Sequence, residues 1–336
     1  MKEALLYEKI SDNKVRCFLC NHKCIISDKS TGICGVRKNN SGTLITLVYD
    51  KIIARHTDPI EKKPLFHFLP GSRSFSIATA GCNLKCSFCQ NSDISQMPVD
   101  HGRIMGESIS PEEIVDEAES GNADTIAYTY TEPTIFYELA KDTARVALSR
   151  GIRNIFISNG YMSLECLDDI SGYIQGANID LKAFNDDFYK KQCGARLEPV
   201  LNTIKKMVMM GIWVEITTLL IPGLNDSEEE LKKLAGFIAA QSVDIPWHIS
   251  RFHPTYKLLN VPPTSADKIH MAKEIGYRAG LRYVYTGNIP GDEGEKTKCH
   301  NCGNLLIDRY GFSVNYLNIR DGKCPECQTP IPGVWK

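Results

Sequence analysis

The stretch GCNLKCSFCQN (81–91) places three cysteines, Cys82, Cys86 and Cys89, directly after the apolar run FSIATA (75–80). That run has the length and composition of a buried strand. Cysteines at such short spacings can bring their thiolates to one metal centre, whereas disulfide bonds need no such spacing. Three thiolates are one fewer than the usual four of an iron–sulfur cube. The stretch therefore predicts a cluster with one iron open to another ligand.

Strand-like and helix-like segments alternate along the chain after residue 75. Six strands are expected before residue 252, and a seventh at 282–285 is an alternative. This alternation predicts βαβ units, right-handed crossovers and a parallel sheet. A complete eight-stranded barrel normally takes ~250 residues, more than this region offers. The predicted fold class is therefore α/β, an incomplete (βα)6 parallel barrel with small cysteine-rich N- and C-terminal modules.

The cysteine loop follows the carboxyl end of the first predicted strand, which is the end where parallel barrels assemble their active sites. This position favours a functional cluster at Cys82, Cys86 and Cys89. Two alternatives remain from spacing alone, namely three core cysteines or a zinc site completed by a histidine.

Composition excludes several classes of protein. The 336 residues carry 39 Lys and Arg against 40 Asp and Glu, so a net charge of −1 gives no general attraction to nucleic acid or anionic lipid. No run approaches the ~18 apolar residues of a membrane span, and the first ten residues are too polar for a signal peptide. We expect a cytoplasmic globular protein with no membrane association and no strong nucleic-acid signal.

Eleven of the 13 cysteines fall into three groups, and only Cys166 and Cys193 stand alone. The last group has two cysteine pairs, Cys299 with Cys302 and Cys324 with Cys327, each spaced as in a zinc ribbon. We expect zinc there, in a closed site that folds the tail. Iron or no metal are the alternatives. We expect Cys166 to be a core residue, whereas Cys193 is either core or a thiol at the barrel mouth.

The first group is Cys17, Cys20, Cys24 and Cys34, with His22 inside it as a substitute ligand. Zinc, an auxiliary iron–sulfur cluster and unmetallated packing all remain open for this quartet. Of the three, only an auxiliary cluster would alter the mechanism, because it could relay electrons or bind substrate.

The cysteine groups suggest three domains. Residues 1–72 form the N-terminal module and connector, 73–290 the partial barrel and 291–336 the zinc-ribbon-like module. Within the first, residues 41–56 alternate like two short strands, and the Pro-rich 58–72 is expected to be a connector.

The spacing C-x3-C-x2-C, with Phe88 before the last cysteine, resembles the radical S-adenosylmethionine (SAM) superfamily. The resemblance implies a [4Fe–4S] cluster on Cys82, Cys86 and Cys89, whose open iron binds the amino and carboxylate groups of SAM. It further implies that one electron from the reduced cluster cleaves SAM to methionine and a 5′-deoxyadenosyl radical, which abstracts hydrogen.

Residues at the ends of other predicted strands match positions that bind SAM in the family that the chain resembles. Glu132, in YTYTEPT (128–134), matches an acceptor for the SAM amino group, and the alternative is a carboxylate at a helix start. Asn159 follows Ser158 in a stretch that allows close backbone approach to a ligand, or is a plain turn. The remaining expected cofactor-binding residues are Phe88, Ser158, Asp180, Lys182 and His253, with an ion pair as the alternative for Asp180 and Lys182 and a structural role as the alternative for His253.

GCNLKCSFCQN, DLK (180–182) and IPGLND (221–226) together resemble the activating enzymes of glycyl radical enzymes, such as pyruvate formate-lyase activating enzyme. Over residues 15–336 the chain is more similar to the AmmeMemoRadiSam system radical SAM enzyme family. The matching stretches are CFLCNHKC (17–24), GICGVR (32–37), DPIEKKPLFHF (58–68), CGARLEPVL (193–201) and CPECQTPIPGVW (324–335).

The expected function is a radical SAM enzyme, an oxidoreductase acting on an unidentified small molecule or protein. Activation of a glycyl radical enzyme is the alternative within the superfamily, and a zinc-binding adaptor is the alternative outside it. The resemblance implies an electron donor of the flavodoxin or ferredoxin type.

Overall fold

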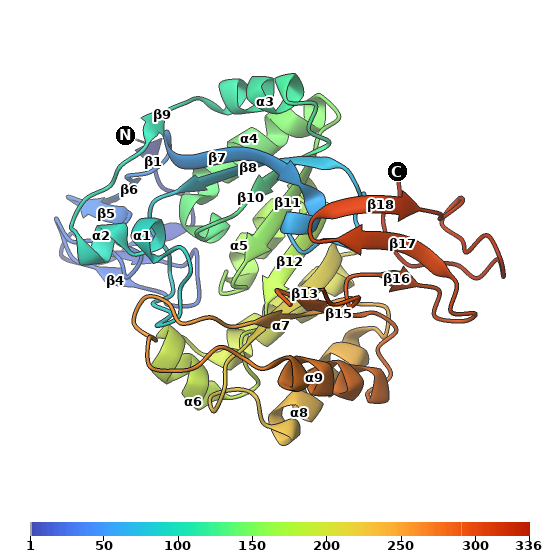
Figure 1. Cartoon of the computed structure of the whole chain (residues 1–336). Coiled ribbons are helices and arrows are strands. Elements are labelled where there is room, and N and C mark those ends of the chain that lie inside the picture. The colour runs from blue at the N-terminus through green and yellow to red at the C-terminus, as the bar shows by residue number, and fades with distance from the viewer. Residues whose placement is uncertain (1, 290) are drawn as a thin grey trace.

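The computed structural model describes residues 2–289 and 291–336, and its centre is a nine-stranded sheet in the order β15-β14-β13-β12-β11-β10-β8-β7-β9 (Figure 1). Neighbouring strands from β8 to β15 pair in parallel. These strands are β8 (Arg73–Thr79), β10 (Thr125–Tyr128), β11 (Arg153–Ser158), β12 (Gly176–Asp180), β13 (Trp213–Leu220), β14 (Trp247–Arg251) and β15 (Val284–Gly287). The predicted α/β fold is confirmed, and β15 forms the alternative seventh strand.

Helices follow the parallel strands, as right-handed βαβ crossovers require. Serine caps begin several of them, and Ser110 also forms a capping box with Glu113. The main helices are α3 (Pro111–Ser120), α4 (Tyr137–Ser149), α5 (Leu164–Ile170), α7 (Leu197–Met209), α8 (Glu228–Gln241) and α9 (Ala266–Arg278). Shorter helical turns are α1 (Ser92–Ser95), α2 (Met97–Asp100), α6 (Asp186–Phe188) and the π-helical turn Tyr189–Cys193. None of the helices in the described part of the chain has the length and apolar character needed to cross a membrane.

The two small modules lie at opposite ends of the molecule in Figure 1. The N-terminal module has two three-stranded sheets, made of β1 (Lys2–Glu3), β6 (Thr43–Thr46) and β5 (Arg37–Asn40), and of β2 (Tyr7–Lys9), β3 (Val15–Cys17) and β4 (Ile25–Ile26). The C-terminal module has one, made of β16 (Thr297–Lys298), β17 (Leu305–Tyr310) and β18 (Ser313–Leu317).

The expectation of two short strands at 41–56 is wrong for the second strand. That strand is the nine-residue β7 (Lys51–Pro59), which pairs with β8 in antiparallel fashion and so extends the central sheet, with β9 (Glu107–Ser108) beyond it. The domain boundaries stay predictions, and the limits at residues 1 and 290 fall on residues outside the described part.

Residues 58–72, expected as a connector, pack inside the amino end of the sheet. Leu65 and Phe68 are fully buried in one cluster with Ala127 of β10 and Ile155 of β11. A side chain at Gly176 of β12 would lie 2.9 Å from the Phe68 ring, so the segment fits only against a glycine. We call residues 58–72 the plug segment, because they fill the interior that an incomplete barrel would leave open.

Glu215 of β13 holds the plug segment in place. Its carboxylate is fully buried and accepts hydrogen bonds from the backbone N–H groups of Phe66 (3.0 Å) and His67 (2.7 Å). The Trp213 indole N–H (3.0 Å) and the His248 ring (2.6 Å) complete its contacts. A buried charge is tolerated only when it is bonded in this way.

The C-terminal module contacts the same segment. The Arg309 guanidinium lies 4.3 Å from the centre of the Phe66 ring and donates a 2.7 Å hydrogen bond to the Phe66 carbonyl. Arg309 also pairs with Glu61, and both side chains are fully buried. The plug segment therefore joins the C-terminal module to the barrel.

We predict that Glu215→Ala destabilises the protein by about 3–5 kcal/mol, because it leaves several buried donors without an acceptor. Urea unfolding measures the loss. The matched control is Glu229→Ala on α8, whose partner Lys233 is exposed like itself, and we expect a change within about 0.5 kcal/mol. Equal unfolding free energies for the two variants would contradict this role of Glu215.

The same carboxylate should make stability depend on pH. Burial alone would raise the pKa of Glu215, but the hydrogen bond and charge of His248 outweigh it and hold the pKa below its ordinary value. A carboxyl group with a lowered pKa in the folded state stabilises fully above its unfolded pKa of about 4.3. We expect this contribution to disappear as the pH falls through the lowered pKa of Glu215. The measurement is the difference in unfolding free energy between wild type and Glu215→Ala, which should shrink over that pH range.

Candidate active site

The three cysteines of the loop after β8 lie at the carboxyl end of the parallel strands, as predicted. Two of their sulfur atoms meet polar groups: the Leu84 N–H lies 3.4 Å from Cys82 Sγ, and the Ser95 hydroxyl lies 3.2 Å from Cys89 Sγ. Burial raises the pKa of the Cys82 thiol well above its ordinary value and also raises that of Cys89. Such thiols stay neutral without a metal, and a bound cation would deprotonate them.

Asn83 belongs to this site, and the sequence did not single it out. Its side chain is buried, and its Oδ1 accepts a 2.8 Å hydrogen bond from Asn159 Nδ2. Its own Nδ2 is buried without a partner. An unpaired buried donor is costly, so a group beside Cys82 that accepts hydrogen bonds would satisfy it. The sulfides of an iron–sulfur cluster are such acceptors, and this donor fits one.

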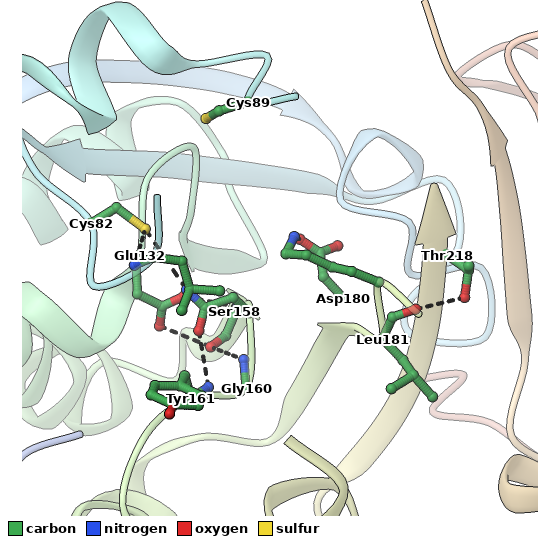
Figure 2. Close-up of polar contacts among 12 residues, drawn as sticks. Cys82, Cys89, Glu132, Ser158, Gly160, Tyr161, Asp180, Leu181 and Thr218 are labelled. Atoms are coloured by element: carbon green, nitrogen blue, oxygen red, sulfur yellow. Dashed lines mark hydrogen bonds and ion pairs between the residues drawn. The ribbon is translucent and has the colours of Figure 1, made fainter. Parts of the chain in front are cut away.

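Glu132 joins the ends of β10 and β11 (Figure 2). Its Oε1 accepts from the Thr134 N–H (3.0 Å), the Thr134 hydroxyl (2.5 Å) and the Ser158 hydroxyl (2.8 Å), and its Oε2 accepts from the Asn159 N–H (2.8 Å). Burial raises the pKa of this fully buried carboxyl. The structure therefore places Glu132 as a support for Ser158 and Asn159. Its predicted contact with the SAM amino group stays a prediction.

Asn159 is brought to the cysteine loop. Its Nδ2 points at Cys82 Sγ, 3.8 Å away, while its Oδ1 accepts a 2.9 Å bond from the Tyr161 N–H. The following Gly160 has φ +70°, and a side chain there would lie 2.9 Å from Ile179. Glycine is thus required to turn the chain so that Asn159 faces Cys82.

Asp180 and Lys182 lie together at the end of β12, as the sequence predicted. Lys182 Nζ is 2.8 Å from Asp180 Oδ2, and the Asp180 side chain keeps 37% of its surface exposed. Burial opposes the charge on Lys182, but Asp180 and the nearby thiols raise its pKa well above the ordinary value. The two charges are therefore available together at the edge of the site.

Cys193 lies beside Cys86, and a hydrogen bond between the two thiols has the largest effect on the pKa of each. It lowers the pKa of Cys86, and the charge of Lys182 adds to this against burial. The same contact raises the pKa of Cys193 well above its ordinary value. Cys193 is fully buried, and its carbonyl accepts from the Lys85 N–H at 2.8 Å, so its segment packs directly on the cysteine loop. Cys166 is buried in α5, as expected for a core residue.

Of the two remaining predicted cofactor-binding residues, Phe88 is buried and His253 is exposed. The Phe88 ring centre lies 5.8 Å from that of Phe188 and 6.0 Å from Lys182 Nζ. His253 lies after β14. Their cofactor contacts stay predictions.

The C-terminal cysteines Cys299, Cys302, Cys324 and Cys327 form a compact group whose sulfur atoms all lie within 4.8 Å of one another. Cys299 Sγ lies 3.6 Å from Cys327 Sγ, and Cys302 Sγ lies 3.7 Å from Cys324 Sγ. A tetrahedral zinc ion with ~2.3 Å bonds separates its thiolates by about 3.8 Å. The group therefore has the ligands and spacing to hold one zinc ion.

Comparisons with known proteins relate the chain to radical SAM enzymes. A family profile described as the radical SAM superfamily matches residues 76–235. An uncharacterized protein of Methanocaldococcus jannaschii is 46% identical over 334 residues, 98% of this chain and 99% of the relative. Pyruvate formate-lyase-activating enzyme of Clostridium pasteurianum is 25% identical over 61% of this chain and 87% of its own.

Among solved structures, a radical SAM methyltransferase from Sphaerobacter thermophilus shares the fold with a TM-score of 0.52. It is 18% identical and covers 71% of each chain.

We predict that Cys302→Ser lowers bound zinc from about one ion per chain to none and makes the C-terminal module sensitive to protease, because a small closed metal site supplies much of its folding energy. Metal analysis and limited proteolysis measure the two effects. The control is Glu326→Ala, an exposed change between Cys324 and Cys327 that should keep zinc. Full zinc in Cys302→Ser would rule out this ligand set.

Proposed function

Because the chain belongs to the radical SAM superfamily, we propose that Cys82, Cys86 and Cys89 hold a [4Fe–4S] cluster and that the protein is a radical SAM enzyme. The observation that carries this proposal is the set of donors around Cys82. The Leu84 N–H and Asn159 Nδ2 lie near its sulfur, and the unpaired Asn83 Nδ2 lies beside it. Hydrogen bonds to cluster sulfur tune its reduction potential.

When bound, the cluster supplies one electron that splits SAM into methionine and a 5′-deoxyadenosyl radical able to abstract hydrogen from a substrate. The chain's own residues orient the reactants. Lys182 and Asp180 present opposite charges that suit the carboxylate and amino groups of SAM. Glu132 keeps Ser158 and Asn159 in position, and the plug segment fills the amino end of the barrel with apolar side chains.

The substrate side of the site is polar. Thr217 of β13 lies opposite Asp180 of β12 in the strand register. Thr217 Oγ1 is buried without a partner, whereas Asn178, two residues before Asp180, donates from Nδ2 to the Pro64 carbonyl of the plug segment. The free Thr217 hydroxyl can donate or accept a hydrogen bond, so it favours a substrate with a polar group, whether a small molecule or a protein side chain.

A second candidate is activation of a glycyl radical enzyme. The names of two relatives support it, the Clostridium pasteurianum activating enzyme and a putative glycyl-radical enzyme activating enzyme of Methanocaldococcus jannaschii. Both matches cover about three fifths of this chain, 61% and 62%. We favour a different substrate, because activases usually lack two terminal cysteine modules. The whole-chain motifs favour the AmmeMemoRadiSam system family, with zinc in the C-terminal module and a flavodoxin or ferredoxin as electron donor.

We predict that wild-type protein, reconstituted and reduced without oxygen, forms 5′-deoxyadenosine from SAM. Cys86→Ala should abolish this product, since the remaining two thiolates cannot hold the cluster. Chromatography of the nucleoside products measures both. The matched control is Cys166→Ala, a core cysteine of α5, which should still cleave SAM.

A wild-type protein that binds zinc but no iron and leaves SAM intact would contradict the proposal. The remaining function would then be that of a zinc-binding adaptor. A glycyl radical appearing by electron paramagnetic resonance on an added partner protein would select the second candidate.

A further inference from the structure

The N-terminal cysteines Cys17, Cys20, Cys24 and Cys34 line one cavity of the N-terminal module. We call these four residues the N-terminal quartet. All four thiols are free, and the same cavity is lined by apolar side chains, among them the buried Leu19, Ile26 and Ile135. Thiolates gathered in this way select zinc, copper(I) or iron–sulfur clusters.

The sulfur atoms of the N-terminal quartet are spaced differently from those of the C-terminal quartet. Across residues 2–289 and 291–336, only the C-terminal quartet brings three or more cysteine, histidine or carboxylate ligands within 4.8 Å of one another. Among the described residues, the N-terminal sulfur atoms do not form the compact group that the four ligands of one zinc ion form. Cys82, Cys86 and Cys89 likewise form no such compact group. Thiolates around a cube of four irons lie farther apart than thiolates on a single ion, so the spacing favours a cluster.

Arg37 gives a second, independent observation. Its side chain is fully buried on the wall of this cavity, and its Nη1 lies 3.4 Å from Cys17 Sγ. Nη2 pairs with the buried Glu138 and donates to the Leu5 carbonyl at 2.8 Å. The Nε–H is buried without a partner. A buried cationic donor left unpaired is costly unless the cavity holds an acceptor, and cluster sulfides and thiolates are anionic acceptors.

The N-terminal quartet also touches the loop that carries the catalytic cysteines. His22, between Cys20 and Cys24, has its Nε2 2.7 Å from the carbonyl oxygen of Asn83. That ring nitrogen is therefore engaged, which argues against His22 as a metal ligand through it. On the other side of Cys82, a side chain at Gly81 would lie 3.3 Å from the Cys34 carbonyl and 2.7 Å from Val36. The two ligand loops are thus in contact on both sides of Cys82.

We propose that the N-terminal quartet holds a second [4Fe–4S] cluster, which passes electrons to the cluster at Cys82, Cys86 and Cys89. The electron-transfer role rests on the proposed function, whereas the metal assignment does not. One electron leaves the reduced N-terminal cluster, which returns to its oxidised form, and the oxidised catalytic cluster gains that electron. A one-electron protein donor of the flavodoxin or ferredoxin class then reduces the N-terminal cluster again. The contact between His22 and Asn83 supplies a bonded route between the two sites.

The test compares metal content in three proteins reconstituted with iron and sulfide without oxygen. Wild type should hold about eight irons and about one zinc. Cys82→Ala/Cys86→Ala/Cys89→Ala should keep about four irons, and its reduced-cluster resonance signal should not change when SAM is added. Cys20→Ser/Cys24→Ser should also keep about four irons, with a signal that SAM does change.

An iron-free triple variant that carries about two zincs would overturn the second cluster and leave a zinc site in the N-terminal module. If Cys20→Ser/Cys24→Ser fails to fold, the iron content of the triple variant by itself shows whether the N-terminal quartet holds a cluster. Wild type that cleaves SAM with about four irons would reject the inference and keep the proposed function. Wild type with about eight irons and no SAM cleavage would reject the proposed function and keep the second cluster.

The electron-transfer role has its own readout, the ratio of SAM cleavage rates with flavodoxin and with dithionite as reductants. We expect this ratio to fall in Cys20→Ser/Cys24→Ser relative to wild type, because only the protein donor uses the N-terminal cluster. The matched control Cys166→Ser should keep the wild-type ratio. An unchanged ratio in Cys20→Ser/Cys24→Ser would overturn the role and leave the metal assignment standing.

Discussion

The buried carboxylate of Glu132 fixes the geometry on which the site depends. Its two oxygens accept four hydrogen bonds from residues at the ends of β10 and β11, which offsets the cost of burying it. Through the Asn159 backbone it sets the direction of the Asn159 side chain, which reaches both Cys82 and Asn83. The Asn83 carbonyl in turn contacts His22, so the N-terminal module is bonded to the same network.

Much of the fold could be predicted because parallel strands and their helices have strong local periodicity. Several predicted strand ends carry residues that the structure gathers there, as at Asp180 and Lys182, whereas His253 after β14 is exposed. The packing of the plug segment could not be predicted, because its partners are far away in the sequence. Phe68 packs against Ala127 and Ile155, and the Phe66 N–H bonds Glu215. The sequence predicted a short strand where β7 lies, but not its length or its place in the central sheet, because its partners β8 and β9 lie elsewhere in the chain.

Asn83 shows a different limit. An asparagine inside a cysteine loop is unremarkable in sequence, and only the unpaired buried Nδ2 marks it as part of the site. The two cysteine quartets show a third limit. Spacing along the chain predicted metal at both ends, but the separation of sulfur atoms in space depends on how each module folds.

The plug segment closes one end of the barrel with fully buried side chains, among them Leu65 and Phe68, and the C-terminal module packs behind it through Arg309. The interior is therefore filled at the amino ends of the strands, whereas the cysteine loop, Glu132 and Asp180 lie at the opposite, carboxyl ends. The side chains that hold the plug segment and those that form the candidate site are thus separate sets. The loops at the carboxyl ends can therefore change without disturbing the packing that supports them.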